Sequence, residues 1–171
     1  MNNDKRIIGK INLTNELKII WKINDAKNIF KMNNGSYIHS PPFDDEDDDN
    51  IKWFIEFYPS GYVESSSKYI GMYLGLYQET QENGFYNIKC DFEVYINNSK
   101  GQPSSLSCKS TGATFVPEKT KKFPEFSGGA YDSLGWTNFA LRTRVKDNLK
   151  NFLNNEGELE IICKMQKSNK K

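Results

Sequence analysis

The clearest pattern along the chain is an alternation of residue types from 69 to 77. Tyrosines and glycines occupy one set of alternate positions, and the other set is Ile70, Met72, Leu74 and Leu76. Alternation of this kind predicts a strand with its aliphatic face in the core. Glycine weakens a strand and marks a place where something approaches the backbone closely. We therefore expect another polypeptide to lie against the tyrosine face of this strand.

Similar short runs recur along the rest of the sequence, separated by turns rich in proline, glycine and asparagine. The predicted strands are 17–23, 36–40, 52–58, 69–77, 86–96, 137–144 and 159–165. A short helical segment is expected around 145–152. Trp21 and Trp53 fall on the apolar faces of their strands and are assigned to the core. The pattern predicts an all-β fold, an antiparallel β-sandwich of about eight strands with one short helix.

The length of 171 residues fits one domain that buries roughly two thirds of its unfolded surface. We place the sandwich at 15–166, after a polar N-terminal extension at 1–14 and before a basic C-terminal tail at 167–171. The stretch 102–132 is rich in serine, lysine, proline and glycine. It is read as an enlarged loop, too long for an ordinary compact connection.

Charge and cysteine content narrow the class of protein. A net charge of +1 with 26% charged residues does not indicate that the protein binds nucleic acid. No apolar run has the length that a signal peptide or membrane insertion requires, so we expect a cytoplasmic protein, with the nucleus left open. Cys90, Cys108 and Cys163 are odd in number and widely spaced, which predicts free thiols.

Catalytic and metal-binding patterns are weak. The only histidine, His39, stands beside two prolines, and no nucleophile elbow surrounds Ser40 or Cys108. The acidic run 44–49 lacks the central glycine and terminal glutamate of a calcium-binding EF-hand loop. It is interpreted as a solvated loop whose charges repel one another. We therefore predict no enzyme activity, no metal site and no cofactor.

Several short motifs, taken in order, resemble the MATH (meprin and TRAF-C homology) family, most closely the MATH domains of speckle-type POZ proteins. The resemblance extends over roughly 17–165. Its pieces are Trp21-Lys22-Ile23, Ser40-Pro41-Pro42-Phe43, Trp53 with Tyr58-Pro59-Ser60-Gly61, Tyr69-Ile70-Gly71-Met72-Tyr73-Leu74, Phe92 with Ile96-Asn97-Asn98-Ser99-Lys100-Gly101, Gly135-Trp136-Thr137-Asn138-Phe139, and Gly157-Glu158-Leu159 with Ile161-Ile162-Cys163.

The resemblance implies a module that binds short linear motifs of partner proteins as an added strand. Tyr73 matches a ring that flanks the bound peptide, and Phe92 matches an aromatic beneath it. The peptide-pairing strand matches Ser133, Leu134, Gly135 and Trp136. This chain departs from the pattern where Leu134 replaces an aromatic residue, and where Ser133 replaces an acid, with Asp132 one position away. A further groove aromatic corresponds to either Phe115 or Phe126.

Alternatives stay open at this stage. Phe92 is in phase with Val94 and Ile96, which favours the core instead of a groove, and Trp136 fits either place. The leading functional prediction is a peptide-recognition adaptor that selects ubiquitin-ligase substrates or takes part in signalling. The second is a structural subunit of a larger complex, docked through its long loop and tails.

Overall fold

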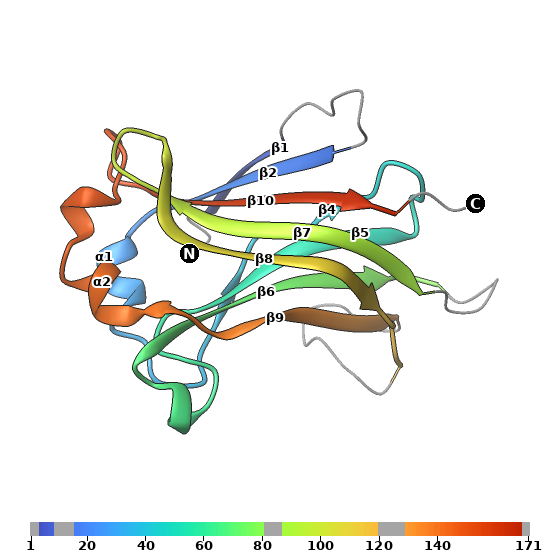
Figure 1. Cartoon of the computed structure of the whole chain (residues 1–171), viewed down its shortest axis with the longest axis horizontal. Helices are drawn as coiled ribbons and strands as arrows, with labels where there is room; N and C mark the ends of the chain where they lie inside the picture. The colour runs from blue at the N-terminus through green and yellow to red at the C-terminus, as the bar shows by residue number, and fades with distance from the viewer. Residues whose placement is uncertain (1–3, 9–15, 81–86, 120–128, 169–171) are drawn as a thin grey trace.

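The computed structural model describes residues 4–8, 16–80, 87–119 and 129–168, which form two antiparallel sheets packed face to face (Figure 1). Sheet A contains, in spatial order, β1 (Asp4–Ile8), β2 (Glu16–Ile23), β10 (Leu159–Lys167), β7 (Ile88–Asn97) and β8 (Pro103–Phe115). Sheet B contains β3 (Ile38–His39), β5 (Ile51–Tyr58), β6 (Tyr69–Gln78) and β9 (Ala130–Leu141), with β4 (Phe43–Asp44) also paired to β5. The predicted β-sandwich is confirmed.

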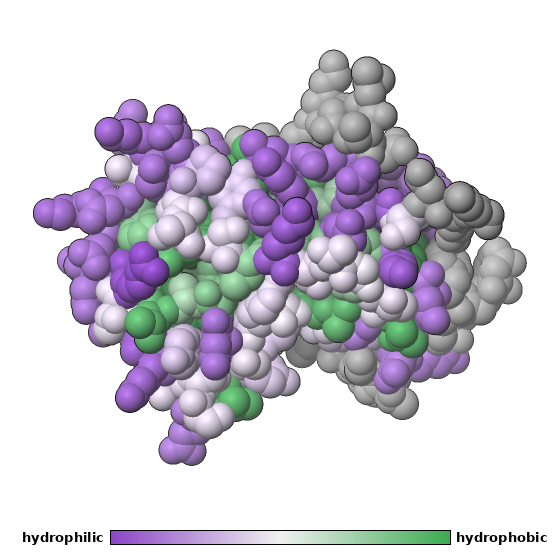
Figure 2. Space-filling view, in the orientation of Figure 1, coloured by the Kyte–Doolittle hydropathy of each residue, from purple (hydrophilic) through white to green (hydrophobic). Residues whose placement is uncertain are grey.

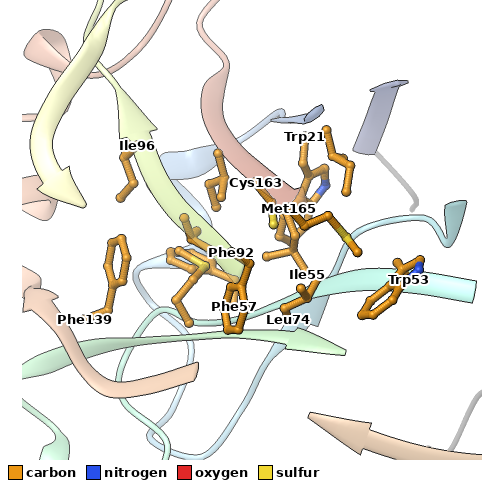
Figure 3. Packing of buried hydrophobic residues seen from close by; sticks show 14 of the residues in the cluster. Trp21, Trp53, Ile55, Phe57, Leu74, Phe92, Ile96, Phe139, Cys163 and Met165 are labelled. Atoms are coloured by element: carbon orange, nitrogen blue, oxygen red, sulfur yellow. The ribbon is translucent and has the colours of Figure 1, made fainter. Parts of the chain in front are cut away.

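The core lies between the sheets, because alternate residues of each strand point inward. Trp21 of sheet A and Trp53 of sheet B are fully buried, as predicted. Figure 3 shows Phe92 from β7 directed into the same space as Phe57 from β5. Cys90 and Cys163 are buried free thiols, and burial raises the pKa of the Cys90 thiol to about 12.

Helices are short in the part of the chain that the structure describes. α2 (Arg142–Lys146) and the 3-10 turn η2 (Leu149–Asn151) occupy most of the region where one helical segment is predicted. The sequence analysis did not predict α1 (Ala26–Ile29) or the 3-10 turn η1 (Glu64–Ser66), because each is only a single turn. Within the described residues, no helix is long and apolar enough to cross a membrane.

The prediction of a loop over 102–132 is wrong for much of that range. β8 occupies Pro103–Phe115 and pairs with β7, and β9 begins at Ala130. β8 is an edge strand in which only Leu106 and Phe115 are buried, so its sequence lacks the apolar alternation that reveals a strand. Its register also shifts opposite Asp91, whose carboxylate accepts a hydrogen bond from the Gly112 amide at 2.6 Å.

The N-terminal extension at 1–14 also needs correction. Within it, β1 pairs with β2 at the edge of sheet A. Five residues that begin with three charged side chains are too short and too polar for periodicity to indicate a strand. At the other end, Lys167 is the last residue of β10, and positions 169–171 of the predicted tail lie outside the described residues.

The acidic run 44–49 is not simply a solvated, self-repelling loop. Asp45 is only 4% exposed, and its carboxylate accepts a hydrogen bond from the Trp53 indole at 2.9 Å. Lys167 lies 2.7 Å from Asp45 and 2.8 Å from Asp47. Lys52 pairs with Asp44. Lysines from two strands therefore neutralise part of the run, and Asp45 fastens the loop to the core.

We expect Asp45→Ala to lower the free energy of unfolding by about 2–4 kcal/mol, because it leaves the buried indole N–H without its partner and leaves Lys167 with Asp47 alone. Asp49→Ala removes the same charge from an exposed position of the same loop and should change stability by less than about 0.5 kcal/mol. Urea unfolding at pH 7 measures both. Equal losses in the two variants would contradict the structural role of Asp45.

Candidate functional site

β6 has the two faces that the sequence predicts, but it is an interior strand. Ile70, Met72, Leu74 and Leu76 are fully buried between the sheets. β5 pairs with one side of β6 and β9 with the other. A partner chain therefore has no free main-chain edge along β6, and pairing has to occur elsewhere.

The glycines of β6 accommodate side chains of the protein itself. A Cβ atom at Gly75 would lie 2.4 Å from the Phe54 ring, and one at Gly71 would lie 3.2 Å from the Cβ of Tyr58. Both neighbours belong to β5. The close approach expected at these glycines is therefore internal, and the prediction that a foreign polypeptide causes it is wrong.

The tyrosines of the same outer face differ in exposure. Tyr77 is 6% exposed and packs with Phe54 beneath Tyr131, whereas Tyr73 keeps part of its ring at the surface. Tyr73 forms a cluster with Tyr58 and Tyr62, in which the three ring centroids lie 5.0–5.7 Å apart. Burial raises the pKa of Tyr73 to about 12, so its hydroxyl keeps its proton at neutral pH.

β9 is the last strand of sheet B, so no described strand of that sheet pairs with its outer edge, although β8 of sheet A lies close to it. Tyr131 exchanges two main-chain hydrogen bonds with Glu118, each 3.2 Å long, on the side away from β6. The main-chain N–H and C=O groups of every second residue point to the same side of an antiparallel strand. Those of Ser133 and Gly135 therefore also point away from β6, like those of Tyr131. Asp132 accepts the Ser133 N–H at 2.9 Å. Among the described residues, none bonds to Gly135 on this side.

A bulge limits this edge at its other end. Met72 faces Trp136, but Ile70 faces Ala140, so the residues 137–139 lie opposite Gly71 alone. Extra residues of this kind bend a strand and interrupt its ladder. The part of β9 that pairs with β6 without a register shift, between the Glu118 bridge and the bulge, therefore runs from 132 to 136.

Side chains border this segment on both faces of the sheet. Leu134 and Trp136 stand opposite Leu74 and Met72, on the inner side, and both are partly buried against the core. Gly135 pairs with Tyr73, and a Cβ atom at Gly135 would lie 2.2 Å from the Met72 carbonyl oxygen, so the close approach of β9 to β6 requires glycine here. Figure 2, viewed with β8 and β9 in front, shows hydrophobic side chains gathered in the middle of this face, with hydrophilic ones around them.

Two residues predicted to contact a peptide are not at the surface. Phe92 is 2% exposed and packs beneath Trp136, with ring centroids 5.3 Å apart. Asp132 is 4% exposed, and its carboxylate accepts the Val116 N–H at 2.7 Å. Both therefore support β9 from within. Phe115 is fully buried, which removes it as a groove aromatic, and Phe126 lies outside the described residues.

Glu56 is a prominent member of this region that the sequence analysis did not single out. It lies on the outer face of β5, is 2% exposed, and accepts a hydrogen bond from the Tyr131 hydroxyl. Burial raises the pKa of its carboxyl from 4.5 to about 8, while a hydrogen bond with Tyr58 acts in the opposite direction. The sequence held one indication of this position: Glu56 lies two residues from both Phe54 and Tyr58, so the three side chains share one face of the strand. In the described part of the chain, no cluster of three or more His, Cys, Asp or Glu could hold a metal ion.

We expect Glu56 to make native stability fall as the pH rises from about 4.5 to about 8. Over this range the unfolded chain releases the proton and the folded chain retains it, which costs at most about 1.4 kcal/mol per pH unit. Glu56→Gln should flatten this slope in urea unfolding measured across the range. Glu93→Gln, on the outer face of sheet A, should leave it unchanged. An unaltered slope in Glu56→Gln would contradict the assignment.

Comparisons with known proteins agree with the fold. Residues 18–165 match the family model described as MATH domain. Among solved structures, the chain is similar to Notothenia coriiceps TRAF5, with a TM-score of 0.53 and 15% sequence identity, over 90% of this chain and 74% of that one. At that identity the likeness concerns the fold alone. A search of curated proteins finds no match. MATH domains are generally protein-interaction modules, and by the extent of the family match this chain belongs to the MATH domain family.

Proposed function

We propose that this MATH domain binds an extended segment of a partner protein as an added strand along β9, between 132 and 136. The observation that carries the proposal is the Gly135 main chain, which is directed away from β6 and has no described partner on that side. Strand addition uses such groups for affinity and uses neighbouring side chains for specificity.

The other sheet edges are less suited to this role. The pairing of β8 with β7 shifts register at two places, so β8 does not offer one regular ladder. β3 has only two residues. β1 begins with Asp4, Lys5 and Arg6, and charged residues on an edge strand oppose pairing with other chains.

The site also limits what the partner segment can be. About five residues fit between the Glu118 bridge and the bulge, so the main-chain pairing is short. Alternate side chains of an added strand point to opposite faces. One set would pass over Gly135 toward Tyr73, and the other would approach Leu134 and Trp136. A contact of this size gives roughly micromolar affinity, strengthened by avidity when several copies cluster.

In the cell such a domain would act as an adaptor for ubiquitin-ligase substrates or for signalling receptors, a role that rests on the motif resemblance, including that to the speckle-type POZ group. The alternative, a structural subunit of a larger complex, drew on an enlarged loop at 102–132. Since 103–115 is strand β8, the observation that favoured this alternative has largely gone.

Strand addition predicts that binding depends on alternate amide groups of the ligand. Peptides selected from a degenerate library of capped hexapeptides would be N-methylated at one position at a time and titrated against the full chain by fluorescence anisotropy. Methylation of an amide that faces β9 should weaken binding roughly tenfold or more, because a hydrogen bond is lost and the methyl group separates the strands. Methylation of the amides that face away should have little effect.

Protein variants locate the site independently. Trp136→Ala should weaken the selected peptides, whereas Tyr69→Ala, at the distant end of β6 beside Leu141, should not. Thermal melting of both variants separates loss of contact from loss of fold. Equal sensitivity to N-methylation at every position, or full binding by Trp136→Ala, would contradict strand addition at β9.

A further inference from the structure

The outer face of sheet B holds a buried carboxyl group beneath aromatic rings. Glu56 stands opposite Tyr73 of β6 and opposite His39 of β3, and Tyr131 of β9 donates a hydrogen bond to it. Tyr58, two residues further along β5, also forms a hydrogen bond with it. None of the described lysines or arginines is paired with this carboxyl. A buried acid without a cation is unfavourable, and most such groups in proteins are paired.

Two of the tyrosines beside Glu56, Tyr62 and Tyr73, present ring surface to solvent, and the buried Tyr58 ring lies beneath them. The rings of Tyr58, Tyr62 and Tyr73 lie 5.0–5.7 Å apart by their centroids, and Tyr62 is 47% exposed. Aromatic ring faces attract lysine and arginine side chains, and the attraction grows when the cation is partly desolvated. The rings and the carboxyl thus combine two features that favour a positive charge at one place.

This cluster can be reached from the edge of β9. Gly135 is exposed and lies directly opposite Tyr73, so no side chain stands between the edge and that ring. Neighbouring strands lie about 4.8 Å apart. A side chain on a strand added to β9 would cross Gly135 to meet Tyr73, which requires a long, extended side chain such as lysine or arginine.

We propose that the Tyr58, Tyr62 and Tyr73 rings and Glu56 form a binding site for a lysine or arginine side chain of the partner segment. This side chain belongs to the residue of the added strand that lies beside Gly135. This inference rests on the proposed strand addition and names the class of segment that it selects. Contact with the ring faces, together with the negative charge that Glu56 gains when a bound cation favours its ionised form, identifies the occupant.

A positional-scanning library tests the proposal on the full chain. Capped hexapeptides carry lysine, norleucine or glutamate fixed at one position at a time, with the other positions degenerate, and binding is measured by competition. We expect lysine to be favoured over norleucine at one position by roughly fivefold or more. Glu56→Gln should remove most of this preference, and the matched Glu93→Gln should retain it.

Tyr62→Ala provides a second test of the lysine preference. This variant should fold normally, because the Tyr62 side chain is 47% exposed. It should lower the lysine preference roughly threefold. Affinity for the lysine library should also rise between pH 6 and pH 8, because a bound cation favours ionised Glu56. His39, Tyr58, Tyr73 and Tyr131 face this carboxyl, so the same pH series on His39→Gln, which removes the imidazole, isolates the contribution of Glu56.

The outcomes separate this inference from the proposed function. Library binding that depends on Trp136 but favours norleucine or glutamate over lysine at every position would contradict the cation-binding site and leave strand addition intact. A lysine preference that persists in Glu56→Gln and in Tyr62→Ala would also overturn it. Absence of library binding to the unaltered protein at pH 6 through pH 8 would overturn both proposals.

Discussion

The packing of Phe54 and Tyr58 onto Gly75 and Gly71 determines which surface of this protein is available to a partner. A side chain at Gly75 would collide with the Phe54 ring, so β5 and β6 depend on the glycine to bring their outer faces together. The rings then cover the backbone of β6, and β9 completes its hydrogen bonding on the remaining side. β6 itself therefore offers no main-chain group to a partner, and the proposed strand addition uses the far edge of β9 instead.

The inner residues of this region act by supporting that edge. Phe92 lies under Trp136, and Asp132 links β9 to Val116 at the end of β8. Neither side chain is exposed enough to contact a ligand, yet each supports a residue or strand of the proposed site. The resemblance to peptide-binding motifs therefore points to residues that the fold brings together around β9, and burial shows which of them cannot contact a ligand directly.

Much of the fold could be predicted from the sequence, because β5, β6, β7 and β10 each place a hydrophobic core residue at every second position. β8 could not be, since an exposed edge strand with two buried residues carries almost no alternation. The role of Glu56 was hidden for a different reason. Its burial arises from rings on three strands that are distant in sequence, and only the assembled sheet brings Tyr73 and Tyr131 to the same carboxyl.

The most direct test of the account is amide hydrogen exchange, followed residue by residue by NMR, with and without a library-selected peptide. Strand addition at β9 predicts that the Gly135 amide, directed outward in the free protein, becomes strongly protected, while the amides of β8 and β1 do not change. Protection that appears along β8 or β1 and leaves Gly135 unaltered would show that the partner docks elsewhere and would contradict the account.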